Sequence, residues 1–76
     1  MPLFYFNIRV QGAVFRDEEG MAFPNLEAAR KEASLGARAM LADALRAHRE
    51  MDSKSIEILD ENRVVLEAIN IRDVLI

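Results

Sequence analysis

Carboxylates are the most concentrated reactive groups in this sequence. Asp17, Glu18 and Glu19 are consecutive and are followed by Gly20. Three adjacent carboxylates suggest calcium binding, but a calcium-binding loop places its oxygen ligands at alternate positions and closes with a distant glutamate. This spacing is absent, so we interpret the segment as a solvated turn rather than a metal site.

The residues needed for nucleophilic catalysis are scarce. Cysteine is absent and His48 is the only histidine, which excludes disulfides, thiolate zinc sites and thiol chemistry. A hydrolase triad needs a histidine base beside its nucleophile, whereas His48 is close to Ser53 and Ser55 in sequence only. Asp60 and Glu61 lie in a predicted turn, where the burial that tunes catalytic carboxylates is not expected. The sequence predicts a protein that is not an enzyme and that has no metal and no cofactor.

Length and charge limit the function classes further. The chain has 76 residues, 51% of them hydrophobic, and a net charge of −3. A single domain this small is marginally stable, and association with a second copy is the expected source of added stability. Its acidic charge makes a nucleic-acid partner unlikely, because nucleic-acid modules usually have a basic footprint. No apolar run approaches the roughly 18–20 residues of a membrane span, and the N-terminus lacks a signal-peptide pattern, so we expect a cytoplasmic protein without membrane contact.

One long helix is predicted from Asn25 to about Arg49, and it is the main element of secondary structure in the sequence. Asn25 suits the N-cap, and alanine, the best helix former, is abundant. One face of this helix carries mostly small residues, which allow close approach to a sheet. Its members are Leu26, Ala29, Ala33, Gly36, Ala37, Met40, Ala44 and Met51. Gly36 is expected to lie against an aromatic ring of that sheet.

Strands are predicted on both sides of the helix from period-two alternation of apolar residues. Their ranges are residues 3–10, 13–16, 55–60 and 63–71. Gln11 and Gly12 form the first hairpin turn, and residues 60–62 form the second. The last strand has apolar residues on both faces, which fits a central strand, a face covered by a partner, or a bulge near Ala68.

The order strand, strand, helix, strand, strand predicts a single α+β domain over residues 1–76. The simplest ββαββ architecture is a mainly antiparallel four-stranded sheet built from two hairpins, with the long helix packed across one face. Phe4, Phe6 and Ile8 would fill the space opposite the small residues of the helix.

A second apolar face on the helix is the best functional signal in the sequence. The possible self-association face consists of Leu35, Ala39, Leu41, Ala42 and Leu45. A helix of this length spans about 36 Å and an eight-residue strand about 26 Å, so the C-terminal third of the helix is expected to overhang the sheet. We expect an antiparallel homodimer in which a basic stripe faces an acidic one. An unknown protein partner is the other possibility.

The possible basic stripe on the same helix supports a different function. It consists of Lys31, Arg38, Arg46 and Arg49. Four cations along one helix are compatible with phosphate contacts, and such binding would weaken steeply with salt. The sequence therefore leaves a nucleic-acid-associated module as the alternative to a self-associating interaction domain.

Several segments in a fixed order carry a family resemblance. They are the aromatic strand Phe4-Tyr5-Phe6 after Met1-Pro2, the Asp17–Gly20 turn, the Leu26-Glu27-Ala28-Ala29 helix start, the 41–45 stretch, and Arg63-Val64-Val65-Leu66. Together they resemble a small single-domain family of unknown function that is common in rhizobia and related alphaproteobacteria. The resemblance covers nearly the whole chain and implies no catalytic or binding residues. Many members have glycine in the second hairpin turn, where this chain has Asn62, which also tolerates left-handed φ.

A weaker likeness, over about residues 17–45, is to HicB-type antitoxins. In their small domain an acidic-glycine turn also leads into a helix that packs on a sheet. This likeness implies an antitoxin-like regulatory module as the alternative function, although a shared fold does not establish one.

Overall fold

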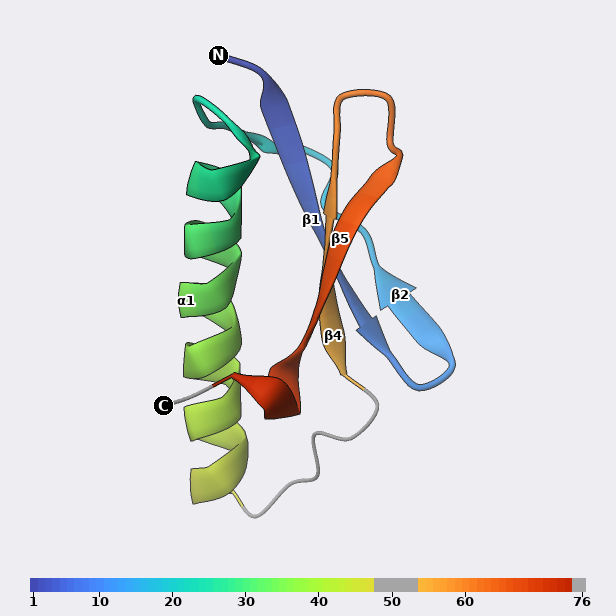
Figure 1. Cartoon of the computed structure of the whole chain (residues 1–76). Helices are drawn as coiled ribbons and strands as arrows, with labels where there is room; N and C mark the ends of the chain where they lie inside the picture. Colours follow the sequence, from blue (N-terminus) through green and yellow to red (C-terminus); the bar gives the residue numbers. More distant parts are fainter. Residues whose placement is uncertain (48–53, 75–76) are drawn as a thin grey trace.

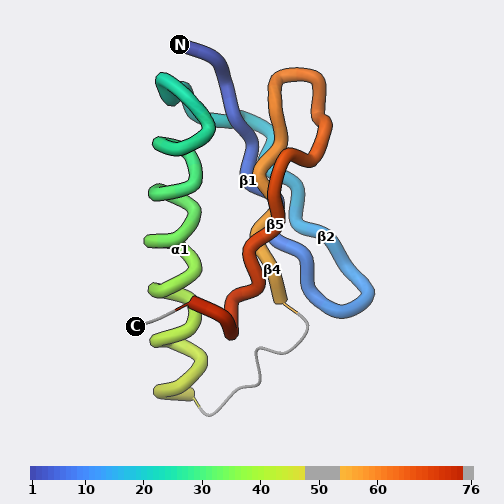
Figure 2. The backbone as a smooth tube through the Cα atoms, viewed as in Figure 1, coloured from blue at the N-terminus to red at the C-terminus, as the bar shows by residue number. Residues whose placement is uncertain are grey.

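The computed structural model describes residues 1–47 and 54–74, and it places one long helix beside a twisted sheet. The elements are β1 (Leu3–Val10), β2 (Ala13–Phe15), β3 (Met21–Ala22), α1 (Leu26–Arg46), β4 (Ser55–Leu59), β5 (Val65–Asn70) and the 3-10 helix η1 (Ile71–Asp73). Figures 1 and 2 show α1 on one side of the sheet only. The predicted α+β class is confirmed, with β3 as an additional short strand before the helix.

The sheet is organised around β1, and its strand order is β2-β1-β4-β5. All pairings are antiparallel. β4 pairs with the middle of β1, from Tyr5 opposite Leu59 to Arg9 opposite Ser55. β2 pairs with residues 8–10 of β1, and β3 pairs with residues 3–4. The two predicted hairpins, β1–β2 and β4–β5, therefore meet through the β1–β4 pair at the centre of the sheet.

The strand predicted over residues 3–10 is confirmed as β1, whereas the helix and the other three predicted strands are shorter than expected. Asn25 is the N-cap and accepts a hydrogen bond from the Ala28 N–H at 2.9 Å. The helix predicted over residues 25–49 ends at Arg46, with Ala47 as the C-cap, and Arg49 lies outside the described residues. The strands predicted over residues 13–16, 55–60 and 63–71 comprise residues 13–15, 55–59 and 65–70. Ile71 leaves the last strand for η1 and is fully buried there.

The turn between β4 and β5 differs from the prediction in its left-handed residue. Among the described non-glycine residues, it is Arg63 that has a positive φ, at 66°. Asn62 does not adopt the left-handed conformation. The Asp60 N–H donates to the Val64 carbonyl, and the Arg63 N–H donates to the Asp60 carbonyl, both at 3.0 Å. These bonds close a three-residue hairpin loop, which needs a left-handed conformation at its third residue. Asn62 is the second residue of that loop.

β5 is an edge strand of the described sheet, so of the three interpretations offered for residues 63–71 the central strand was wrong. The predicted bulge is present, but it lies two residues before Ala68. Ile58 pairs with Glu67 and Leu59 pairs with Val65, which leaves Leu66 as the extra residue. One additional residue shifts the side-chain alternation, and this explains why apolar residues occur on both faces of the segment.

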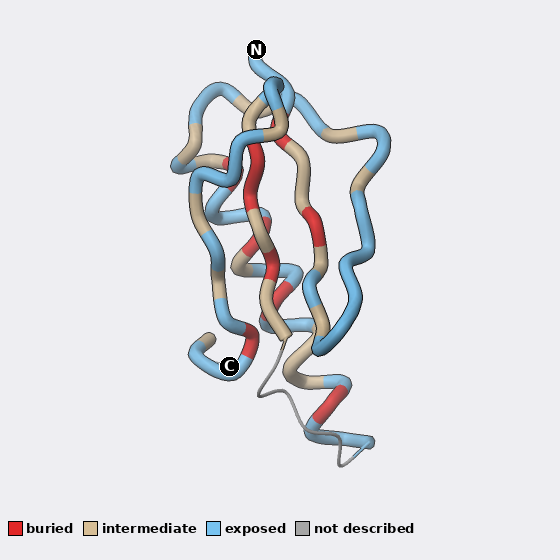
Figure 3. Tube along the Cα trace, turned by 90° about the vertical axis from the view of Figure 1, so that its right-hand side faces the viewer, coloured by how far each residue is buried: buried red, intermediate tan, exposed pale blue. Residues whose placement is uncertain are grey.

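The core lies between the small face of α1 and the two central strands. Ala29, Ala33 and Ala37 are buried against Ile56 and Ile58 of β4. Small side chains bring the helix axis close to the sheet, and the isoleucines fill the remaining space. Figure 3 shows the buried residues along the middle of the sheet and the adjoining side of the helix, with exposed residues at both outer strands.

The expectation that Gly36 lies against an aromatic ring was wrong, and the expected overhang of α1 was only partly correct. Gly36 is exposed, and a Cβ there would meet no ring; the nearest atom is Ile56 Cδ1 at 3.9 Å. Figure 1 shows the last turns of α1 extending past the end of β4. However, Ala44 in those turns is only 4% exposed, and η1 packs against the helix. The expected overhang is therefore partly covered.

Candidate functional site

The acidic turn after β2 contains a polar cluster on the sheet face opposite α1. The Asp17 carboxylate accepts three backbone N–H groups: Glu19 (3.2 Å) and Gly20 (3.0 Å) at Oδ1, and Phe6 (3.1 Å) at Oδ2. In return, the Asp17 N–H donates to Asn7 Oδ1 at 3.0 Å. Phe6 lies between the segments of β1 that pair with β2 and β3, so the Asp17 side chain takes the place of a strand partner there. The solvated-turn interpretation was wrong for Asp17.

Arg63 completes this cluster from the β4–β5 loop. Its guanidinium lies 3.8 Å from the centre of the Tyr5 ring and donates to the Asp17 carbonyl at 2.8 Å. Partial burial favours the neutral form of Asp17, but the hydrogen bonds from Gly20, Phe6 and Glu19 and the charge of Arg63 outweigh it and lower the pKa of Asp17. The polar groups satisfy one another, so this cluster supports the fold instead of presenting a free reactive group.

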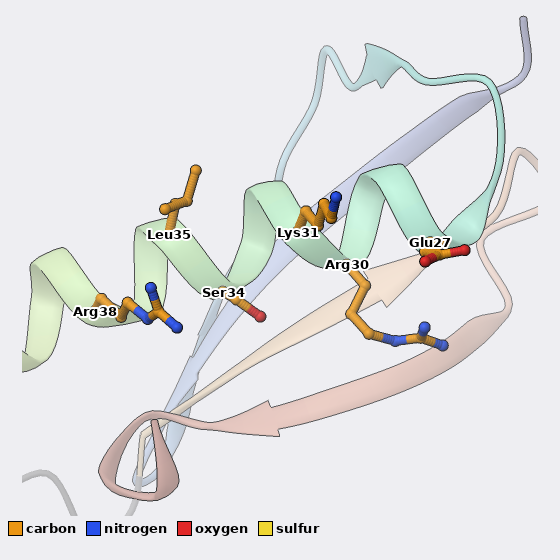
Figure 4. A pocket seen from close by; sticks show the side chains of 6 residues that line it. All are labelled: Glu27, Arg30, Lys31, Ser34, Leu35 and Arg38. Carbon is orange, nitrogen blue, oxygen red and sulfur yellow. The ribbon is translucent and has the colours of Figure 1, made fainter. Parts of the chain in front are cut away.

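A groove runs along the β5-facing flank of α1. Its volume is about 410 Å³, and it is lined by Glu27, Arg30, Lys31, Ser34, Leu35 and Arg38. Figure 4 shows Arg30 and Ser34 extending from the helix toward β5, whereas Leu35 points away from the sheet. These residues recur every three or four positions, which places them on one side of the helix.

The charges of the groove are unequally compensated. Arg30 donates to Glu67 of β5 at 2.7 Å. The hydrogen bond from Arg30 lowers the pKa of Glu67, and the same bond raises the pKa of Arg30. Lys31 and Arg38 have no ion pair within residues 1–47 and 54–74. The groove therefore presents two cations without an ion pair among the described residues, a third held by Glu67, and one carboxylate, Glu27.

The predicted basic stripe is divided in the structure. Lys31 and Arg38 line the groove, whereas Arg46 forms an ion pair with Asp43 on its own helix. Arg49 lies outside the described residues. Sequence reasoning missed Arg30, although its place beside the small face of the helix follows from helical periodicity. Its partner Glu67 could not be found in this way, because the bulge at Leu66 decides which side of the sheet that residue faces.

The predicted self-association face forms the outer side of α1 only in part. Leu35 and Leu45 are 57% and 56% exposed, Ala39 is exposed and Ala42 is half-buried. Leu41, in contrast, packs against the core. The two exposed leucines are ten positions apart, about 15 Å along the helix, and the exposed Arg38 lies between them on this side.

Symmetry changes what this face implies about charge. In an antiparallel pair of helices related by a two-fold axis, the rotation leaves each flank of the helix on the same side of the interface. The basic flank of one helix therefore lies beside the basic flank of its partner. Lys31 and Arg38 would then face their own copies instead of Glu32 and Asp43. The basic-to-acidic pairing that we expected for an antiparallel dimer does not follow from this geometry, and like charges across an interface weaken it.

The outer edge of β5 is a second exposed apolar surface. Val64, Val65 and Leu66 are consecutive and are 54%, 49% and 41% exposed. The Ile71 N–H donates to the Lys54 carbonyl at 3.0 Å, and in an antiparallel ladder every second residue faces the same neighbour. The backbone groups of Ile69 therefore face β4. Those of Ala68 and Asn70 face away from β4, where the described chain provides no further strand.

Within residues 1–47 and 54–74, no group of three or more histidine, aspartate or glutamate side chains is arranged to hold a metal ion. Among the described helices, none is long and apolar enough to cross a membrane.

A known domain family matches residues 3–72 of the chain, from the start of β1 to η1. It is the domain of unknown function DUF6894. The chain belongs to this family. No curated protein and no solved structure matches the chain. The DUF6894 domain thus comprises all the strands and the helix described above, including the β5 edge and the groove on α1.

Proposed function

We propose that this DUF6894 domain is a non-catalytic, cytoplasmic interaction domain that forms a homodimer through the edge of β5. The observation that supports this proposal is the apolar outer edge of that strand, with which no other described strand pairs. Natural proteins usually protect an edge strand by keeping it short or charged. β5 has six residues, and its one charged side chain, Glu67, is occupied by Arg30.

Symmetry and charge together favour one register for the paired strands. A two-fold axis at Glu67 would place two carboxylates directly opposite each other, which is destabilising. An axis at Ala68 pairs Glu67 with Ile69 of the partner. The backbone groups of Ala68 face outward, so the two copies of Ala68 would exchange both hydrogen bonds of an antiparallel pair.

The test combines molar mass with a charge placed at the axis. At about 100 μM protein, a dimer with a Kd of about 1 μM is nearly complete, and light scattering after size exclusion should give twice the chain mass of 8.6 kDa. Within one chain, Ala68→Lys places the new lysine opposite Glu57 of β4. In the proposed dimer, the same lysine lies opposite the lysine of the partner copy. We expect it to remain folded and to weaken the dimer at least about tenfold.

Two control variants locate the interface. Phe15→Lys places the same charge on β2, at the other end of the sheet, and should leave the dimer intact. Leu35→Glu tests the outer side of α1 and should also leave it intact. A wild-type monomer at this concentration would refute self-association, whereas loss of the dimer in Leu35→Glu alone would move the interface to the helix.

Hydrogen exchange provides an independent readout. The outward N–H groups of Ala68 and Asn70 should exchange more slowly as protein concentration rises, while the N–H of Ile69, which faces β4, should not change. Equal concentration dependence at all three positions would contradict strand pairing.

The nucleic-acid alternative has weaker support. Of its predicted cations, only Lys31 and Arg38 remain without an ion pair in the described chain, while nucleic-acid binding gains its affinity from many lysine and arginine contacts to phosphates.

A further inference from the structure

The groove on α1 differs in charge from the chain as a whole. The whole chain has a net charge of −3, whereas the groove has three cations and one carboxylate, Glu27. Glu67 offsets Arg30 at 2.7 Å, and Glu27 offsets one further charge. The remaining positive charge lies on Lys31 and Arg38, which have no ion pair among the described residues. Local positive charge on an acidic protein attracts an anionic partner.

The spacing of these cations limits the size of that partner. Lys31 and Arg38 are seven positions apart, which is about 10.5 Å along the helix. Two carboxylates two helical turns apart have the same spacing. Glu27 adds negative charge at the N-terminal end of the groove, so the favourable positions for an anion lie from Lys31 onward.

Between Lys31 and Arg38, the groove offers a ligand one polar and one apolar side chain, Ser34 and Leu35. The Ser34 hydroxyl lies between the two cations and can donate a hydrogen bond. Leu35 is 57% exposed at the rim, where it offers an apolar contact. Arg30 is fixed toward β5 by its ion pair (Figure 4), so one wall of the groove is already ordered. Pre-ordered walls reduce the entropy lost on binding.

From this arrangement we propose that the groove binds an acidic amphipathic peptide helix of a partner protein. Two carboxylates of the peptide, two turns apart, contact Lys31 and Arg38, and an apolar side chain between them packs on Leu35. An exposed leucine favours a peptide over a nucleic acid, because phosphate groups gain nothing from apolar contact. The site is complete in one chain, so it does not rest on self-association through β5.

Fluorescence anisotropy tests this proposal with defined probes. The probe is a fluorescein-labelled helical peptide with glutamates seven positions apart and leucine between them, and its glutamine counterpart is the peptide control. The Lys31→Glu/Arg38→Glu double variant should bind the probe about tenfold more weakly or worse, because two attractive pairs become repulsive. Added salt should weaken wild-type binding, since exposed charges are screened.

Matched variants separate the groove from net charge and from dimerisation. The Arg16→Glu/Arg72→Glu double variant makes the same change of net charge outside the groove and should bind like the wild type. Leu35→Ala favours the helix, so it should remain folded while binding several-fold more weakly. Ala68→Lys should bind like the wild type, whether or not the protein dimerises.

Three results would overturn the proposal. The first is equal affinity for the glutamate and glutamine peptides. The second is unchanged binding in both the groove double variant and Leu35→Ala. The third is binding of labelled polyuridylate, with the same dependence on Lys31 and Arg38, without binding of the peptide. Failure of self-association with peptide binding intact would refute only the proposed dimer.

Discussion

Asp17→Asn is the most informative single substitution in this fold, because it changes the charge and one atom of the central polar cluster but not its shape. Asp17 Oδ1 accepts the N–H groups of Glu19 and Gly20, and Oδ2 accepts that of Phe6. An asparagine that keeps its oxygen toward the turn places its NH₂ group against the Phe6 N–H, so two donors oppose each other. The opposite rotamer keeps the bond to Phe6 and loses the other two.

The expected cost follows from these contacts. Leaving a buried donor without an acceptor costs about 1–3 kcal/mol, and hydrogen bonds to a charged group are stronger than those to a neutral one. We expect Asp17→Asn to lower the free energy of unfolding by about 2 kcal/mol. For a domain of this size that is roughly 8–16 °C in Tm. Urea unfolding at pH 7 measures it, and Glu18→Gln, which removes a neighbouring carboxylate, is the control and should change stability by less than about 0.5 kcal/mol.

The pH dependence provides a second check with a defined sign. The pKa of Asp17 is lowered in the folded state from its ordinary value of 3.8. Its stabilising contribution is therefore present above the unfolded pKa and is lost as pH falls through the folded pKa. The stability difference between wild type and Asp17→Asn should be constant from about pH 7 to pH 5 and should shrink below about pH 4. A difference below about 0.5 kcal/mol at pH 7, or one that persists unchanged to pH 2, would refute the role assigned to this carboxylate.

Two further substitutions test neighbouring parts of the same cluster. Arg63→Gly removes the cost of a left-handed conformation, about 1–2 kcal/mol, but it also loses the stacking on Tyr5 and a charged hydrogen bond, and it makes the unfolded chain more flexible. We therefore expect the free energy of unfolding in urea to fall by about 1 kcal/mol. A stabilised variant would show that backbone strain outweighs the contacts. Gly20→Ala and Gly12→Ala share the penalty of positive φ, but the new Cβ lies 2.8 Å from Tyr5 Cε1 at position 20 and has no neighbour within 4 Å at position 12. By thermal unfolding, Gly20→Ala should therefore cost at least about 1 kcal/mol more than Gly12→Ala, and equal losses would indicate that Tyr5 moves aside freely.

Local patterns in the sequence were sufficient for the elements that depend on neighbours along the chain. Asn25 caps α1 because its side chain reaches the N–H of Ala28, three residues on. The buried positions Ala29, Ala33 and Ala37 follow directly from helical periodicity. The alternation in β1 likewise identified Phe4 as a core residue. These features need no knowledge of distant residues.

Features that depend on registration between segments could not be predicted. The bulge at Leu66 determines that Glu67 faces Arg30, and no local pattern fixes the position of that extra residue. The role of Asp17 depends on the gap between β2 and β3 along β1. β3 itself has only two residues, too few to show an alternating pattern. The groove on α1 was thus only partly visible in the sequence, through Lys31, Arg38 and Leu35.

The central position of β1 has a consequence for how the chain reaches this structure. Tyr5 and Leu59 lie opposite each other in the β1–β4 ladder although they are 54 positions apart. A loop of that length must close before the sheet gains its central hydrogen bonds, and such non-local pairing makes folding slower than in helical proteins of similar size. During synthesis, the β1–β2 hairpin and α1 are translated before β4. The apolar residues of β1 therefore remain without their main partner strand until nearly the whole domain has been translated.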